Sequence, residues 1–107
     1  MTKLEELQLF YNRIVDLTPL ASLSHLKWLF ASYNRVVELT PLRGLTNLYA
    51  LYLEYNHIED ITPLVGSAGL GATSTVRLAD NCLDTRPGDL TMECIEQLRE
   101  RGASIGY

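Results

Sequence analysis

The sequence predicts an α/β solenoid, with a parallel sheet on its concave side, irregular or 3₁₀-like arms on its convex side, and a capping helix at its C-terminal end. Three observations lead to this prediction. The stretch YNRIVDLTPL, which begins at Tyr11, returns in nearly the same form from Tyr33 and from Tyr55. Apolar residues coincide within each copy, and helix signals follow where the repeat stops. A fixed period is typical of architectures in which each unit buries its apolar side chains against the next.

The repeat has a strict length. Asn12, Asn34 and Asn56 stand 22 residues apart, and the three copies share the pattern L-x-x-L-x-L-x-x-N-x-I with few changes. The L-x-L element alternates with period two, which predicts a short strand in each copy with its leucines directed inward. Residues 1–69 are therefore expected to form three repeats. Residues 70–107 are expected to form a divergent fourth repeat and a cap within the same domain.

Two further elements of each copy indicate how neighbouring turns are bonded and which shape the return arm takes. An asparagine amide both donates and accepts, so a column of asparagines is expected to bond N–H and C=O groups of neighbouring turns. Thr-Pro also recurs at one place in every copy. Proline fixes φ and holds the residue before it extended, which favours an irregular or 3₁₀-like arm over a long helix. The pairs are Thr18-Pro19, Thr40-Pro41 and Thr62-Pro63.

The fourth repeat departs from this register. Its asparagine, Asn81, follows Asn56 by 25 residues rather than 22. The stretch VGSAGLGAT contains three glycines, and we expect it to absorb the extra length in a wider bend.

A helix is predicted after the fourth repeat. Asp89 or Thr91 is expected to cap it, and Gly102 is expected to end it before a last extended piece, ASIGY. Such a helix would cover the open end of the leucine stack. Its predicted apolar face consists of Leu90, Cys94, Ile95 and Leu98.

Composition narrows the classes of function. A chain of 107 residues with a net charge of −4 fits one compact domain and argues against binding to nucleic acid or to an anionic membrane. No apolar run approaches the roughly 20 residues that a membrane span needs. Cys82 and Cys94 are too few for a disulfide framework, which leaves free buried thiols, a single bridge or a reactive thiol. His25 and His57 lie far from them in the sequence, so no metal site or cofactor is predicted.

These repeats resemble the 22-residue class of leucine-rich repeats found in internalins and in regulatory subunits of protein phosphatase 1. The L-T-P-L element after Asn-x-Ile is the specific link, and the closing stretch GLGATSTVRLADNCLD…IEQLRERGASIGY resembles the final repeat and cap of bacterial leucine-rich repeat proteins. The resemblance covers essentially the whole chain. It implies a right-handed coil that binds a partner and carries out no catalysis.

The resemblance also bears on whether the chain is part of a longer protein and on the compartment in which it lies. No capping segment precedes Leu4, so we expect a C-terminal part of a longer solenoid. The alternative is a short chain that associates with another molecule through its uncapped N-terminal edge. No secretory signal is visible, so the compartment stays open between the cytoplasm and, for part of a longer protein, the cell surface or the exterior.

The residues between the inward leucines vary from copy to copy and are expected to form the concave face. Eight of the nine aromatic residues lie in these strand segments. Because the leucines already supply the core, exposed rings on a rigid sheet are suited to act as binding anchors. The residues predicted to contact a partner are Gln8, Phe10, Trp28, Phe30, Tyr52, Glu54 and Arg77.

Two columns of residues next to the asparagines have alternative interpretations. Tyr11, Tyr33 and Tyr55 precede the asparagines and either stack as a structural ladder or contact the partner. Basic residues follow the asparagines, and acidic residues come three positions later. We expect weak surface pairing between these two columns, Arg13, Arg35 and His57 on one side and Asp16, Glu38 and Asp60 on the other. The alternative is a basic strip that binds phosphate, which the facing acids disfavour.

The predicted function is a non-catalytic module that binds a protein or peptide on its concave face. No nucleotide-binding, zinc-protease or serine-hydrolase motif is present, and Cys94 on an apolar helix face is typical of packing rather than catalysis. A spacer and C-terminal cap of a larger surface or regulatory protein is the alternative. Carbohydrate binding is a third hypothesis, disfavoured because only Glu6, Gln8, Glu54 and Arg77 supply polar groups near the rings.

Overall fold

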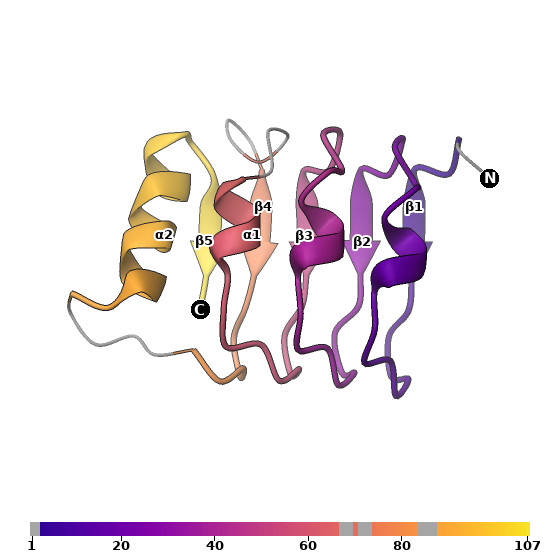
Figure 1. Cartoon of the computed structure of the whole chain (residues 1–107), viewed down its shortest axis with the longest axis horizontal. Helices are drawn as coiled ribbons and strands as arrows, with labels where there is room; N and C mark the ends of the chain where they lie inside the picture. Colours follow the sequence, from indigo (N-terminus) through magenta and orange to yellow (C-terminus); the bar gives the residue numbers. More distant parts are fainter. Residues whose placement is uncertain (1–2, 67–69, 71–73, 84–87) are drawn as a thin grey trace.

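The structure, a computed structural model, describes residues 3–66, 70, 74–83 and 88–107. Its strands lie side by side in sequence order, and each pairs in parallel with the next (Figure 1). The predicted solenoid with a parallel sheet is therefore confirmed. The strands are β1 (Glu6–Gln8), β2 (Trp28–Phe30), β3 (Ala50–Tyr52), β4 (Thr75–Arg77) and β5 (Ser104–Gly106).

The register of the sheet follows the repeat. Leu7 pairs with Leu29 and Leu29 with Leu51, whereas Leu51 pairs with Val76, so the longer fourth repeat keeps its strand in line. Most of the predicted glycine-rich bend falls on residues 67–69 and 71–73, outside the described residues. The predicted extended piece at the end of the chain forms β5, in which Ile105 pairs with Val76.

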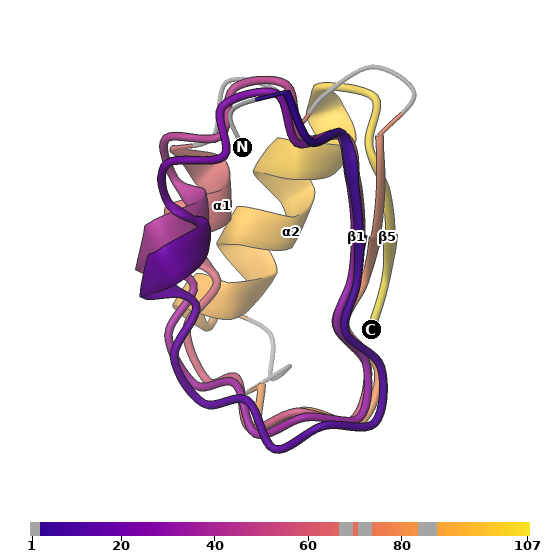
Figure 2. The ribbon, with the colours of Figure 1, turned by 90° about the vertical axis from the view of Figure 1, so that its right-hand side faces the viewer.

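A short helical turn stands opposite the sheet in each of the first three repeats. The turns are η1 (Thr18–Leu20), η2 (Thr40–Leu42) and α1 (Thr62–Val65); the first two are 3₁₀ helices, and the third is a single turn of α-helix. Each contains its proline in the first turn, where a missing N–H group breaks no helical hydrogen bond. Viewed along the stack, the coils superpose, with the sheet on one side and these turns on the other (Figure 2).

The side chains of the acidic column accept hydrogen bonds from the threonines of these turns and, among the described residues, do not pair with those of the basic column. Asp16 accepts hydrogen bonds from the backbone N–H group and the hydroxyl of Thr18. Glu38 accepts from the Thr40 hydroxyl, and Asp60 accepts from the Thr62 backbone. The predicted pairing of the acids with Arg13, Arg35 and His57 is wrong for the described residues, where the one ion pair joins Lys27 and Glu5. Each acid lies two positions before a threonine. A local hydrogen bond to that threonine therefore competes with an ion pair to a more distant arginine.

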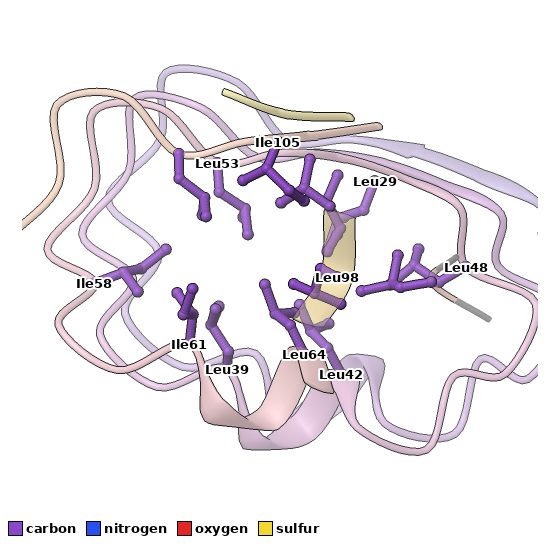
Figure 3. Close-up of a cluster of buried hydrophobic side chains, with 14 of the residues drawn as sticks. Leu29, Leu39, Leu42, Leu48, Leu53, Ile58, Ile61, Leu64, Leu98 and Ile105 are labelled. Carbon is purple, nitrogen blue, oxygen red and sulfur yellow. The ribbon is translucent and has the colours of Figure 1, made fainter. Parts of the chain in front are cut away.

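The core lies between the sheet and the turns. Side chains from the strands, the turns and the helix α2 (Leu90–Glu100) converge there, among them Leu29, Leu64 and Leu98 (Figure 3). Burial is unequal along the stack. In the second coil Leu29, Val36 and Leu42 are fully buried, while the matching Leu7, Ile14 and Leu20 of the first coil are only partly buried. Among the described residues the first coil packs against another coil on one side only, so its inward side chains are less covered.

The helix α2 closes the other end of the stack and packs against α1 and β5 (Figures 1 and 2). Asp89 caps it by accepting a hydrogen bond from the Thr91 N–H group at 2.9 Å, and Gly102 follows it with φ of +99°. Cys94, Ile95 and Leu98 are buried as predicted. The prediction for Leu90 is wrong, since 57% of it is exposed and Thr91 is buried instead. The inward face runs through residues 91, 94, 95 and 98, which places position 90 on its flank.

Candidate functional site

The concave face is the surface of the sheet directed away from the core. Strand residues alternate in direction, so the neighbours of the buried Leu29 and Leu51 lie on this face. The parallel register brings four predicted contact residues into one central row, in the order Gln8, Phe30, Tyr52 and Arg77. A second row, one position beyond the last strand leucine, contains Phe10, Ser32, Glu54 and Ala79.

Three rings form a continuous strip along the face. Phe30 stacks on Tyr52 with ring centroids 4.9 Å apart and planes 11° apart, and Phe10 lies tilted against Phe30 at 5.7 Å. Phe10 is exposed, whereas Phe30 and Tyr52 are partly covered by their neighbours. Such contacts hold the rings in fixed orientations, which lowers the entropy that a partner must remove on binding.

Trp28 belongs to a separate cluster at the start of the strands. Its ring meets Tyr49 edge to face with centroids 5.3 Å apart, and the Lys27 ammonium lies 6.0 Å from the ring centroid. Lys27 also pairs with Glu5 at 3.1 Å. The structure therefore couples Trp28 to Tyr49, a residue that sequence reasoning left out of the site. The signal was present, because Tyr49 stands immediately before β3 in the column that contains Glu5 and Lys27.

The tyrosines before the asparagines form a ladder at the edge of the concave face. Tyr33 lies between Tyr11 and Tyr55, with both pairs of ring centroids 4.4 Å apart and the planes within 13° of parallel. All three residues have φ near +60°, a left-handed conformation that is uncommon for side chains of this size. Burial between its neighbours raises the pKa of the Tyr33 phenol, and the phenols of Tyr55 and Tyr11 raise it further. The stacking matches the structural interpretation of this column, while contact with a partner stays a prediction.

Polar side chains on the face are engaged with one another. The Gln8 amide donates to Glu6 at 2.7 Å, and the Ser32 hydroxyl donates to Glu54 at 3.0 Å. Arg77 lies across Gly106 of β5, where an added Cβ would approach the guanidinium to 3.0 Å. Arg77 is therefore placed at the C-terminal end of the central row, beyond the aromatic strip.

The repeat pattern and its geometry correspond to a known family of sequences. A family model described as leucine-rich repeats, in two copies, matches residues 24–66. Residues 24–66 therefore contain leucine-rich repeats. The solved structural neighbours of the chain include such proteins along nearly its whole length. No curated protein sequence matches.

Three solved structures illustrate the similarity. Internalin C2 from Listeria monocytogenes has 29% identity and a TM-score of 0.75, and the match covers 97% of this chain and 42% of that one. Another Listeria monocytogenes internalin, internalin F, has 27% identity and a TM-score of 0.68, with 97% and 36% covered. A leucine-rich repeat protein from Leptospira interrogans shares the fold at 18% identity and a TM-score of 0.60, with 94% and 30% covered.

The leucine-rich repeat chain thus spans less than half the length of these three proteins. Leucine-rich repeat domains are generally protein-binding modules and are typically not enzymes. In the described part of the chain, no group of three or more histidine, cysteine, aspartate or glutamate side chains is placed to hold a metal ion. Within the same residues, no helix has the length and apolar character to cross a membrane.

The two cysteines have different surroundings. Both thiols are free, but Cys82 is exposed and only Cys94 is buried, so the prediction of buried thiols is correct for one of the two. Burial raises the pKa of the Cys94 thiol, and the nearby carboxylates of Asp60 and Glu93 raise it further. A thiol that is kept protonated and covered in this way is suited to packing rather than to nucleophilic chemistry.

Proposed function

We propose that this leucine-rich repeat chain binds a protein or peptide partner through the aromatic surface of its concave face, without catalysis. The observation that carries the proposal is the arrangement of the rings. Phe10, Phe30 and Tyr52 form a strip, and Trp28 with Tyr49 forms a second cluster beside it. The second and third coils do not need these rings for their core, since their inward leucines are already fully buried.

Physical considerations support a binding role for such a surface. Tyr and Trp provide a large contact area with few rotatable bonds to immobilise. Here the rings are already held by one another and by a hydrogen-bonded sheet, so little ordering remains to be done on association. Interfaces usually depend on a few such anchors within a larger contact area.

The test compares two double variants with the wild-type chain as bait for binding partners. Trp28→Ala with Tyr52→Ala removes one ring from each cluster. Val37→Ser with Leu90→Ser removes exposed apolar side chains outside the concave face and serves as the matched control. Circular dichroism establishes that all three proteins are folded. A partner recovered by the wild type is identified, purified and titrated against each protein by calorimetry.

We expect the control variant to bind as the wild type does. Loss of each ring should weaken binding by roughly 30-fold if both are hot spots. Equal affinities of the wild type and the concave-face variant for every partner would remove the case for these residues.

A structural role is the second candidate function, and the cap favours it. The helix α2 and strand β5 close the stack at its C-terminal end, as the last elements of a longer solenoid would do. In that case the concave-face variant should leave partner binding by a longer protein unchanged, while variants at the buried residues of α2 lower its stability.

A further inference from the structure

A groove on the concave face combines aromatic walls with a single carboxylate. It has a volume of about 390 Å³ and lies between the tyrosine ladder and the row that begins with Phe10. Its lining consists of Phe10, Tyr11, Ser32, Tyr33, Glu54 and Tyr55. The groove therefore runs across three neighbouring coils, next to the aromatic strip that carries the proposed function.

The ladder gives this groove a fixed wall. The rings of Tyr11, Tyr33 and Tyr55 stack at 4.4 Å, and their backbone N–H groups bond to the carbonyl oxygens of the next coil, at Ser32, Glu54 and Ala79. Tyr11 is 74% exposed at the end of the stack, so its outer ring face is open to solvent. Stacked rings on a hydrogen-bonded backbone keep their shape when a ligand arrives.

The carboxylate of Glu54 is also held in place. One of its oxygens accepts a hydrogen bond from the hydroxyl of Ser32 at 3.0 Å, and Ser32 itself is only 4% exposed. An ionised carboxylate has about four acceptor sites, so most of its capacity is not used by this bond. No lysine, arginine or histidine lines the groove, and the one ion pair of the described residues lies elsewhere, between Lys27 and Glu5.

We propose that this groove takes a lysine or arginine side chain of the protein partner, an inference that rests on the proposed function. The cationic group pairs with the Glu54 carboxylate, and the aliphatic stem packs along the rings of Phe10 and the tyrosine ladder. Aromatic rings also attract cations directly. The net charge of −4 on the whole chain favours approach by a basic partner.

The test uses a pair of short peptides that differ in one charge. One is an acetylated, amidated glycine peptide with a central arginine, and the other carries citrulline, which has nearly the same shape but no charge. Backbone amide NMR of the whole chain follows each titration. We expect saturable shifts at Ser32, Tyr33 and Glu54 with the arginine peptide, and smaller shifts that do not saturate with citrulline.

Two variants, each of which replaces one carboxylate, test whether Glu54 is the group that binds the arginine side chain. Glu54→Gln keeps an acceptor for Ser32 but removes the charge, and we expect it to weaken binding of the arginine peptide by at least about threefold. Glu6→Gln changes another carboxylate of the same face outside the groove and should leave the affinity unchanged. Raising the salt concentration should weaken binding to the wild type more than to Glu54→Gln.

The outcomes separate this inference from the proposed function. Equal binding of the arginine and citrulline peptides, or an unchanged affinity in Glu54→Gln, overturns the inference. Another outcome is a protein partner that is lost with Trp28→Ala and Tyr52→Ala but kept with Glu54→Gln. In that outcome the proposed function stands, and only the binding of a lysine or arginine side chain in the groove is overturned. Absence of any saturable shift with the arginine peptide also overturns it.

Discussion

Asn56 donates its side-chain N–H group to the carbonyl oxygen of Ala31, 25 residues earlier in the chain, at 3.0 Å. The same amide donates to Leu53 of its own coil, and its oxygen accepts from the Val36 N–H group at 3.0 Å. One side chain therefore ties two coils together at the point where the strand ends. Because Asn56 is buried, water cannot replace these bonds, and each coil depends on the asparagine of the next.

Replacing this asparagine tests the dependence. We expect Asn56→Ala to lower the free energy of unfolding by roughly 2–4 kcal/mol, since it removes the acceptor of the buried Val36 N–H group and leaves the Ala31 carbonyl with Asn34 as its side-chain donor. Asn12→Ala is the matched control. Asn12 is exposed and its side-chain N–H groups bond to Leu9 and Phe10 of its own coil, so the loss should be about 1 kcal/mol or less. Urea denaturation followed by circular dichroism measures both, and equal losses would contradict the ladder.

The repeat made this part of the fold predictable. A 22-residue period places the leucines and asparagines in columns, and the column of Asn34 and Asn56 forms the predicted hydrogen bonds. The charges were not predictable in the same way. Asp16 has Thr18 within two residues, and the choice between a local bond and a distant arginine depends on backbone geometry that spacing does not reveal. The partner of Trp28 was also missed, because Tyr49 lies outside the alternating strand positions.

The left-handed backbone of the tyrosine ladder gives a second prediction. Tyr33→Gly and Tyr33→Ala both remove the ring and its two stacking contacts, but only alanine keeps a Cβ at φ of +61°. We expect the glycine variant to be more stable than the alanine variant by roughly 1 kcal/mol. At Tyr52, which lies in β3, the order should reverse, because glycine weakens a strand. Thermal denaturation of the four variants decides this, and the same order at both positions would contradict the role of the backbone.

The hydrogen bonds at η1 give a pH dependence. The hydroxyl of Thr18, and then its backbone N–H group, lower the pKa of Asp16 below its ordinary value of 3.8. A carboxyl whose pKa is lower in the folded state stabilises the fold above the unfolded pKa, and this contribution is lost as the pH falls through the folded value. Carboxyl NMR should therefore report a pKa for Asp16 below 3.8. Thr18→Val should raise it and Thr18→Ser should restore it, whereas a pKa indifferent to the hydroxyl would refute this account.

The cysteines should react at very different rates. Cys82 is exposed, while Cys94 is buried in α2 with a raised pKa. We expect iodoacetamide to modify Cys82 in the folded protein and Cys94 only after denaturant is added. Mass spectrometry of the two peptides over time measures this. Cys82→Ser provides the control, since its folded form should take up almost no reagent; rapid labelling of that variant would show that the cap opens easily.

The cap itself is expected to be stabilised mainly by side chains that point into the stack. Ile95 is fully buried, so Ile95→Ala should lower the free energy of unfolding by roughly 2–5 kcal/mol. Leu90 on the same helix is 57% exposed, and Leu90→Ala should change the free energy by no more than about 0.5 kcal/mol. Because each coil is stabilised chiefly by its neighbours, the damage should spread from the C-terminal end. Hydrogen exchange should show faster exchange in α2 and β5 of Ile95→Ala than in β2, and uniform acceleration along the sheet would mean that the stack unfolds as one unit.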